Sequence, residues 1–159
     1  MKRPWFHLVG LLAFALAILT TVKGQASAPA GRYAIANGAV YDTKTNLTWQ
    51  QIISVGMYTQ AEAGSYCATL GLNGATWRLP TMREILTIVD LSIGPPGPTI
   101  DTTAFPGTPG GFFWTSTQYS GTPVNYWSAQ FQYGFAYGNT KTDTSYVRCV
   151  FSGRGSAPR

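Results

Sequence analysis

Trp77-Arg78-Leu79-Pro80-Thr81-Met82-Arg83-Glu84 (WRLPTMRE) is the stretch of this 159-residue chain that determines where the second of its two predicted helices can begin. Pro80 keeps Leu79 out of the helical region, so the helix begins after Pro80. Thr81 and Glu84 have the spacing of a capping box, in which the hydroxyl accepts from the Glu84 amide while the carboxylate accepts from the cap amide. The stretch therefore predicts a short helix that ends before Gly94-Pro95-Pro96. Its buried stripe is expected to consist of Ile85, Leu86, Ile88 and Val89.

A second capping box lies upstream, at Thr59-Gln60-Ala61-Glu62, and predicts a first helix. The residues that follow on one helical face are Ala63, Tyr66, Cys67 and Leu70. This spacing directs Cys67 into the core. Gly71 supplies a residue that ends the helix.

From Phe112 onward the hydrophobic period changes to two, which predicts antiparallel strands. One series expected to face the core is Trp127, Phe131 and Tyr133, with Ala129 between them. A second series alternates Val147, Cys149 and Phe151 with Tyr146, Arg148 and Val150. Turns are expected near Gly134 and at Gly138-Asn139. Earlier strands are expected at residues 32–35, 39–41 and 47–51, so the fold class is α+β, with two short helices packed on antiparallel strands.

Residues 94–111 (GPPGPTIDTTAFPGTPGG) contain five prolines and five glycines. This composition excludes regular secondary structure. It predicts a long, ordered surface loop between the second helix and the later strands.

Residues 1–28 have the composition of a secretory signal peptide, and residues 29–159 are then a single domain with its core at about 32–151. A positive start precedes the uncharged, mostly apolar run 8–22, and small residues follow. An uncleaved anchor is the alternative. Loss of the signal peptide lowers the net charge from +5 to +2, too little for the basic stripe that nucleic-acid binding requires. We therefore expect no nucleic-acid partner and, after cleavage, no membrane span.

The chain has two cysteines, Cys67 and Cys149, and one histidine, His7, which lies in the predicted signal peptide. Without His7 the exported part has no Ser-His or Cys-His nucleophile pair and no histidine metal ligand. Two cysteines in an oxidising compartment are typical of one disulfide, which would join the first helix to the last strand.

The six acidic residues offer little for a catalytic pair of carboxylates. We expect no catalytic residue, no metal and no cofactor.

Several motifs occur in an order that resembles one protein family. They are Asp42-Thr43-Lys44-Thr45-Asn46-Leu47-Thr48-Trp49-Gln50, the cysteine-bearing helix 63–70, Trp77-Arg78-Leu79-Pro80-Thr81 with Glu84, Ile100-Asp101 with Phe105-Pro106, Phe113-Trp114-Thr115-Ser116-Thr117 and Val147-Arg148-Cys149-Val150. Together they resemble the carboxy-terminal domain family of the Legionella collagen-like protein, over residues 32–151. WRLPT is the most unusual single motif, and the ordered set is more specific than any member.

The resemblance implies a C-type-lectin-like α+β fold in which a helix cysteine pairs with a cysteine of the final strand. It also implies an exported protein that is secreted, periplasmic or held at the cell surface. The namesake domain is associated with adhesion and with binding of sulfated glycosaminoglycans. By this analogy a glycan or glycosaminoglycan is the expected partner.

Ligand-binding candidates come from the ring-rich second half of the chain. Tyr119, Tyr126 and Tyr137 lie near expected turns, where exposed rings stack on sugar faces, and Arg148 would contribute if it is exposed. Arg78 admits two interpretations, an anion-binding fork or a buried structural arginine that pairs with Glu84 or Asp101 and stacks on Trp77. We favour the second. The residues expected to be structural are Trp77, Arg78, Leu79, Pro80, Thr81, Glu84 and Trp114.

The leading hypothesis is an exported, non-catalytic binding module that presents loops 94–111 and 118–126 to a glycan or a surface partner. The alternative is a structural or assembly domain that contacts other proteins, including copies of itself, without a sugar site. An enzyme would require two carboxylates in one cleft. No calcium-dependent sugar signature is present, so we expect no metal site.

Overall fold

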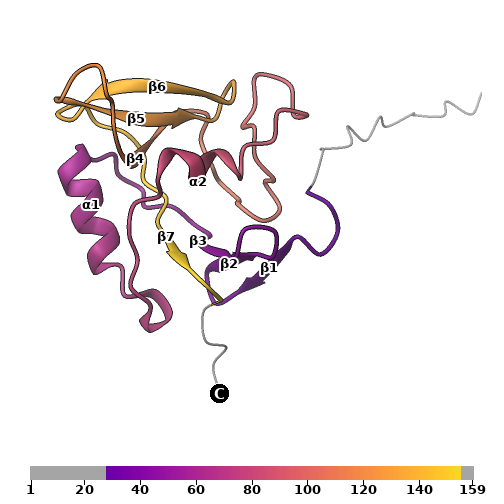
Figure 1. The fold of residues 1–159 in the computed structure, drawn as a ribbon. Coiled ribbons are helices and arrows are strands. Elements are labelled where there is room, and N and C mark those ends of the chain that lie inside the picture. Colours follow the sequence, from indigo (N-terminus) through magenta and orange to yellow (C-terminus); the bar gives the residue numbers. More distant parts are fainter. Residues whose placement is uncertain (1–27, 155–159) are drawn as a thin grey trace, which may run out of the picture.

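The computed structural model describes residues 28–154 (Figure 1). The elements in chain order are β1 (Tyr33–Ala36), β2 (Ala39–Asp42), β3 (Leu47–Gln50), α1 (Gln60–Thr69), the 3-10 turn η1 (Leu72–Gly74), α2 (Met82–Leu86), β4 (Phe112–Gln118), β5 (Asn125–Gln130), β6 (Phe135–Thr140) and β7 (Val150–Ser152). Apart from Ala28, the predicted signal peptide 1–28 lies outside the described residues. Within residues 28–154 no helix has the length and apolar character needed to cross a bilayer.

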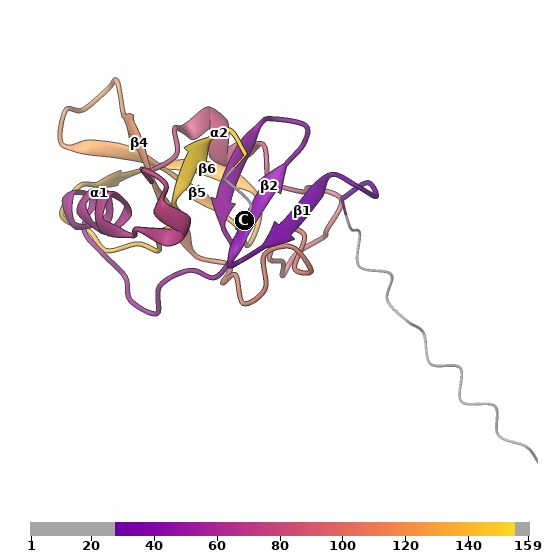
Figure 2. The same ribbon diagram turned by 90° about the horizontal axis from the view of Figure 1, so that it is seen from below.

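Two antiparallel sheets form the body of the domain. One sheet has the order β1-β2-β3-β7 and the other the order β4-β5-β6. In Figure 1 α2 lies between the sheets and α1 flanks them on one side, and Figure 2 shows the first sheet and α1 at opposite sides of the molecule. The α+β class and the two short helices are confirmed. The three early strands lie within a residue or so of their predicted positions.

Both capping boxes form as predicted. The Glu62 carboxylate accepts from the Thr59 amide at 2.9 Å, and the Glu84 carboxylate accepts from the Thr81 amide at 2.7 Å. Helix α1 buries Ala63 and Cys67. Gly71 follows with a φ of +60°, the left-handed conformation that ends helices at low cost for glycine.

Helix α2 is shorter than predicted and ends at Leu86. The β-branched run that follows is a poor helix former, and the Thr87 hydroxyl donates to the Glu84 carbonyl at 2.7 Å. Ile85 and Ile88 are buried, but Leu86 is 41% exposed. The prediction that Leu86 belongs to the buried stripe is therefore wrong.

The 94–111 segment has no helix or strand, as predicted, but its centre is not on the surface. Ile100 and Phe105 are fully buried in the core. The Thr99 amide donates to the Phe131 carbonyl at 2.7 Å, which ties the segment to the end of β5. The Asp101 carboxylate accepts from the amides of Thr103 and Ala104 and so folds the chain inward.

The antiparallel strand β5 is confirmed, but the predicted alternation is not, because Ser128 and Gln130 are buried as well as Ala129. Strand β5 ends at Gln130, and Gly134, with a φ of +74°, reverses the chain, so Phe131 is buried while Tyr133 is 53% exposed. Tyr133 was predicted to face the core, which is wrong. The turn near Gly134 is confirmed. The turn predicted at Gly138-Asn139 is wrong, because both residues lie inside β6.

The final segment of the chain is buried on both of its sides. Val147, Arg148, Cys149 and Val150 are each 0% exposed. Val150 belongs to one hydrophobic cluster, beneath β5 and α2, while Val147 and Cys149 belong to the other, beside α1. The segment therefore separates two packed layers.

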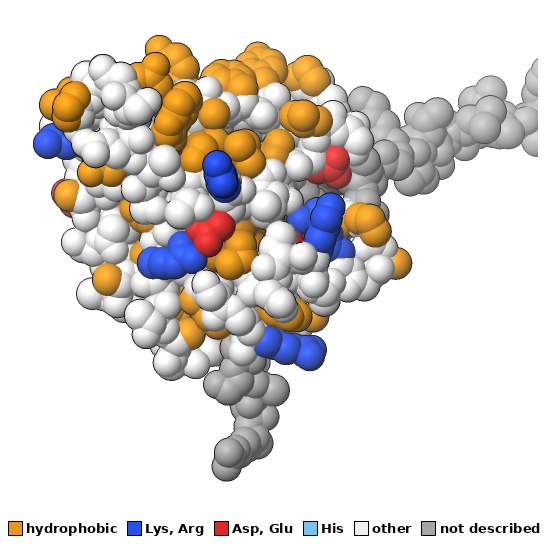
Figure 3. Space-filling model, viewed as in Figure 1, with side chains coloured by type: hydrophobic (Ala, Val, Ile, Leu, Met, Phe, Trp, Pro, Cys, Tyr) orange, Lys and Arg blue, Asp and Glu red, His pale blue; other side chains and the backbone are white. Residues whose placement is uncertain are grey.

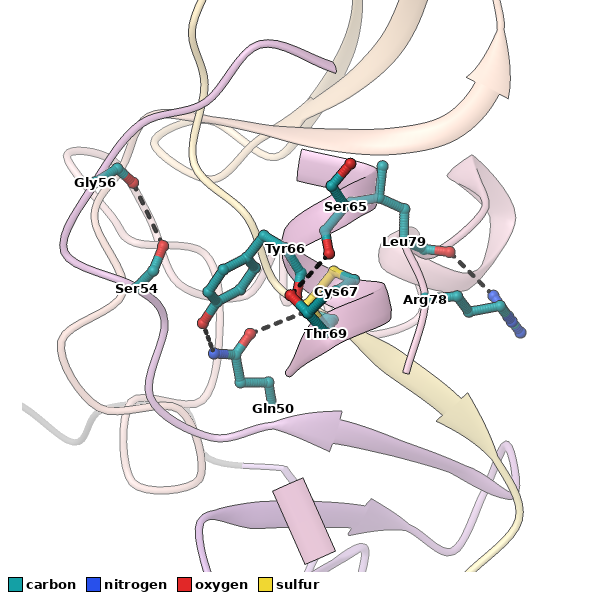
Figure 4. The surroundings of a disulfide bond; sticks show 10 residues. Gln50, Ser54, Gly56, Ser65, Tyr66, Cys67, Thr69, Arg78 and Leu79 are labelled. Carbon is teal, nitrogen blue, oxygen red and sulfur yellow. Dashed lines mark hydrogen bonds between the residues drawn. A yellow bond between two sulfur atoms is a disulfide. The ribbon is translucent and has the colours of Figure 1, made fainter. Parts of the chain in front are cut away.

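The predicted disulfide joins Cys67 of α1 to Cys149, with the two Cα atoms 5.5 Å apart (Figure 4). Gln50 supports it from β3, because its amide side chain donates to the Tyr66 hydroxyl at 2.7 Å and accepts from the Cys149 amide at 3.2 Å. The backbone amide of Gln50 also donates to the Cys149 carbonyl at 2.9 Å. The helix, the strand β3 and the final segment thus meet at one point.

Removal of the disulfide by the double substitution C67A/C149A should lower the free energy of unfolding by roughly 2–4 kcal/mol. The bridge closes a sequence separation of 82 residues, for which loop-closure entropy sets an upper limit of about 4–5 kcal/mol. Urea unfolding followed by tryptophan fluorescence measures the difference. An unchanged midpoint would show that the packing alone holds α1 in place.

Candidate functional site

Arg78 forms hydrogen bonds within the domain through both its side chain and its backbone. Its two terminal nitrogens donate to the two carboxylate oxygens of Glu84 at 2.8 and 2.7 Å. Its backbone exchanges hydrogen bonds with Val150 at 3.0 and 2.9 Å. The predicted pairing with Glu84 is present, but the side chain is 43% exposed rather than buried, and Trp77 packs on Phe151 instead.

Of the other residues expected to be structural, Trp77, Leu79, Pro80 and Trp114 are buried, while Thr81 and Glu84 form the capping box of α2. Trp77 and Trp114 are buried, and their ring nitrogens donate to the carbonyls of Leu72 at 2.8 Å and Tyr58 at 2.6 Å. Leu79 is also buried, and the Pro80 carbonyl accepts from the Ser116 amide at 2.8 Å. The WRLPT element therefore links β7, α2 and β4.

Arg148 does not reach solvent, which removes it from the ligand candidates. It is 0% exposed, and its role depended on exposure. Its terminal nitrogens donate to the carbonyls of Gln50 and Gln51 and to the Thr108 hydroxyl. Alternation along the predicted last strand placed Arg148 on the face opposite Cys149, and no sequence pattern indicated that this second face is also covered.

The three candidate tyrosines differ in exposure. Tyr137 is 56% exposed, Tyr119 is half-buried, and Tyr126 is half-buried against the cluster beside α1. Tyr119 and Tyr137 line the same hollow, together with Asn125, Trp127, Ala136 and Gly138. The structure thus brings two of the three together and leaves Tyr126 out of the lining.

This ring hollow has a volume of about 410 Å³. The rings of Tyr119 and Trp127 meet edge to face, with centroids 4.8 Å apart. A Cβ atom at Gly138 would lie only 3.0 Å from the Tyr119 ring, so glycine is what lets the ring lie against β6. Asn125 adds an amide that can donate and accept hydrogen bonds.

A row of exposed rings borders the ring hollow. Tyr133 stacks on Phe135 with centroids 6.3 Å apart, and Phe112 contacts both Phe135 and Tyr137 at 6.2 and 5.9 Å. Figure 3 shows hydrophobic side chains gathered over the β4-β5-β6 end of the molecule. Sequence reasoning missed Tyr133 and Phe135, although the Gly134 turn that exposes them was predicted.

All acidic side chains between residues 28 and 154 have hydrogen-bond or ion-pair partners inside the domain. Asp42 pairs with Arg32 at 2.9 Å, and Glu62 and Glu84 complete the capping boxes. The remaining three accept backbone amides: Asp90 from Ser92, Asp101 from Thr103 and Ala104, and Asp143 from Thr140. No cluster of three or more His, Cys, Asp or Glu side chains suited to a metal occurs in this part of the chain.

Hydrogen bonds from Thr59 lower the pKa of Glu62, and the two ion-paired carboxylates, Glu84 and Asp42, also have pKa values below their ordinary range. Hydrogen bonds from Arg78 lower the pKa of Glu84 and outweigh the opposing effect of its burial. Burial acts to raise the pKa of Asp42, but hydrogen bonds from Arg32 and from the Lys44 amide prevail and lower it. Both ion-paired carboxylates therefore stabilise the fold in their ionised form.

Acid should unfold the wild type partly through Glu84. Because its pKa in the fold lies below the unfolded value of about 4.3, its contribution is complete above that pH and is lost as the pH falls through the folded pKa. The variant Glu84→Gln should be less stable than wild type at neutral pH. Its unfolding midpoint in urea should also fall less steeply between about pH 5 and pH 3. Equal pH slopes for the two proteins would contradict the role given to the Arg78–Glu84 pair.

Comparison with protein-family models matches residues 38–151 to the Lcl C-terminal domain. The matched segment contains both cysteines, the WRLPT element and the ring hollow. A search of the curated proteins gives no match.

Proposed function

The chain belongs to the Lcl C-terminal domain family, and from this we propose that it is a non-catalytic binding module whose ring hollow takes the face of an uncharged sugar. The observation that carries the proposal is the pair Tyr119 and Tyr137 in one hollow with Trp127. Rings of this kind stack on apolar sugar faces while their polar atoms bond hydroxyls. Asn125 supplies a further donor and acceptor.

The distribution of charge favours an uncharged glycan over a sulfated one. Arg32 and Arg78 are held in ion pairs, and Arg148 is buried. Figure 3 shows the Lys and Arg side chains of this face scattered rather than gathered near the rings. A sulfated chain requires several neighbouring cations to bind firmly, so stacking carries more of the expected affinity than charge.

We also propose that the fold is C-type-lectin-like and that the domain is exported to the periplasm or the cell surface. The bridge from a helix to the final segment supports the first proposal, because the resemblance implies that pairing. A disulfide with buried sulfur atoms supports the second, because such bonds persist in oxidising compartments. The signal peptide at residues 1–28 remains the expected export signal.

A glycan array and heparin retention at low salt test the sugar proposal. We expect binding to uncharged oligosaccharides, weak heparin retention, and a loss of roughly two- to tenfold in affinity for Tyr137→Ala. Leu91→Ala, which changes another side chain that is 71% exposed, is the matched control. A folded protein that is silent on the array would refute the proposal.

A second candidate function, assembly, is favoured by strand β6. Its sequence FAYGNT has no charge and no proline, and β6 pairs with β5 alone at the edge of its sheet. Exposed, uncharged edge strands of this kind pair with further strands. The exposed rings of Phe135 and Tyr137 would be covered in such an assembly.

Sedimentation velocity tests assembly through β6. If copies associate there, the double variant F135K/Y137K should sediment as a monomer at concentrations where wild type is oligomeric, because like charges would face one another. Ile35→Lys, at an exposed side chain of β1 in the other sheet, should leave the oligomer intact. A wild type that is monomeric at all concentrations would rule out self-assembly.

A further inference from the structure

A second hollow lies between the loops 51–57 and 106–109. This loop groove has a volume of about 470 Å³, and its lining includes Ile52, Ile53, Val55, Pro106, Pro109 and Tyr146. Val55 is 104% exposed and Ile52 is 57% exposed. The groove therefore presents aliphatic surface to solvent, and its size is within the range of small-molecule sites.

The buried Arg148 holds the two walls of the loop groove together. Its guanidinium donates to the Gln50 and Gln51 carbonyls at 2.6 and 2.8 Å, and to the Thr108 hydroxyl at 2.6 Å. Gln51 directly precedes one wall, and Thr108 lies within the other. The cation thus bonds residues next to both walls of the groove, without itself being part of the lining.

The charge of Arg148 is not neutralised inside the described chain. Between residues 28 and 154 the ion pairs are Arg32–Asp42 and Arg78–Glu84, and the Nε atom of Arg148 has no hydrogen-bond partner in this range. The guanidinium packs on the ring of Phe105, 4.8 Å from its centroid. Burial lowers the pKa of Arg148 to about 9, which leaves it cationic at neutral pH. An unpaired charge with little water around it exerts a field on neighbouring sites.

We propose that the loop groove binds a medium-chain fatty acid, with its alkyl chain on the aliphatic wall and its carboxylate at the end nearest Arg148. The aliphatic lining suits the chain, and the unpaired cation behind the walls suits the single negative charge. The site is separate from the ring hollow, since the two linings share no residue. This inference does not depend on the sugar proposal.

The backbone of the groove favours an alkyl chain over a peptide. Pro106 and Pro109 have no N–H group, so this wall offers few donors to the carbonyls of an extended peptide. A peptide docked here would leave amide groups without partners, at a cost in binding free energy. A fatty acid has polar atoms at one end only and avoids this cost.

Nuclear magnetic resonance titration of the folded wild type tests the proposal with three probes of equal chain length. These are decanoate, decanol and decyltrimethylammonium, each below its micelle concentration at pH 7. We expect decanoate to bind about tenfold more tightly than decanol, the magnitude expected of one partly screened charge, and the ammonium to bind most weakly. Methyl signals of Ile52, Ile53 and Val55 should shift. Equal affinities for the three probes, no binding of decanoate, or shifts confined to other regions would overturn the proposal.

Substitutions test the aliphatic wall and the role of Arg148 separately. Val55→Ser should weaken all three probes in parallel, while Leu91→Ser, at an exposed position outside the lining, should weaken none. Arg148→Met should remove the preference for decanoate over decanol, and Arg148→Lys should retain it. If Arg148→Met does not fold, the head-group comparison on wild type and Val55→Ser still decides. A folded Arg148→Met that keeps the tenfold preference would overturn the role of the cation.

Discussion

The fold depends on the final segment of the chain, residues 146–152, which pairs with several parts of the domain at once. Tyr146 exchanges backbone hydrogen bonds with β4, Val150 pairs with both β3 and Arg78, and Cys149 is bonded to α1. A segment that meets partners on every side is buried, and its backbone polar groups need hydrogen-bond partners there. The disulfide fixes the one partner that is a helix and cannot join the ladder. The segment 146–152 therefore holds the two sheets in position.

Short sequence motifs were sufficient to predict the starts of both helices, the end of the first helix at Gly71 and the disulfide. Both capping boxes, the left-handed Gly71 and the disulfide depend on short spacings or on a single pair of residues. The burial of Arg148 and of Ile100 depends on which segments cross over them, and no local period carries that information. The exposure of Tyr133 was unpredictable for the same reason, because it depends on where strand β5 ends. Of the candidate site, exposed Tyr137 was predictable, while its meeting with Trp127 required the pairing of β5 with β6.

The acidic residues and the exposed groups near β6 bear on the function of the domain. Every acidic residue of the described chain serves a cap, a turn or an ion pair. The exposed groups near β6 are rings and amides, which bind without reacting. The family to which the chain belongs suggests a non-catalytic module, which is consistent with the proposed role in recognition.

The two proposed ligand surfaces share one support. Tyr146 lines the loop groove, its backbone bonds to Phe112 and Trp114 of β4, and its ring packs on Phe113 with centroids 5.5 Å apart. Phe112 in turn contacts Tyr137 beside the ring hollow. The chain of contacts runs along β4, whose Phe113 and Trp114 are buried, and so connects both surfaces to the final segment. The disulfide at Cys149, three residues from Tyr146, restrains the same segment, and we expect this preorganisation to lower the entropic cost of binding at either proposed surface.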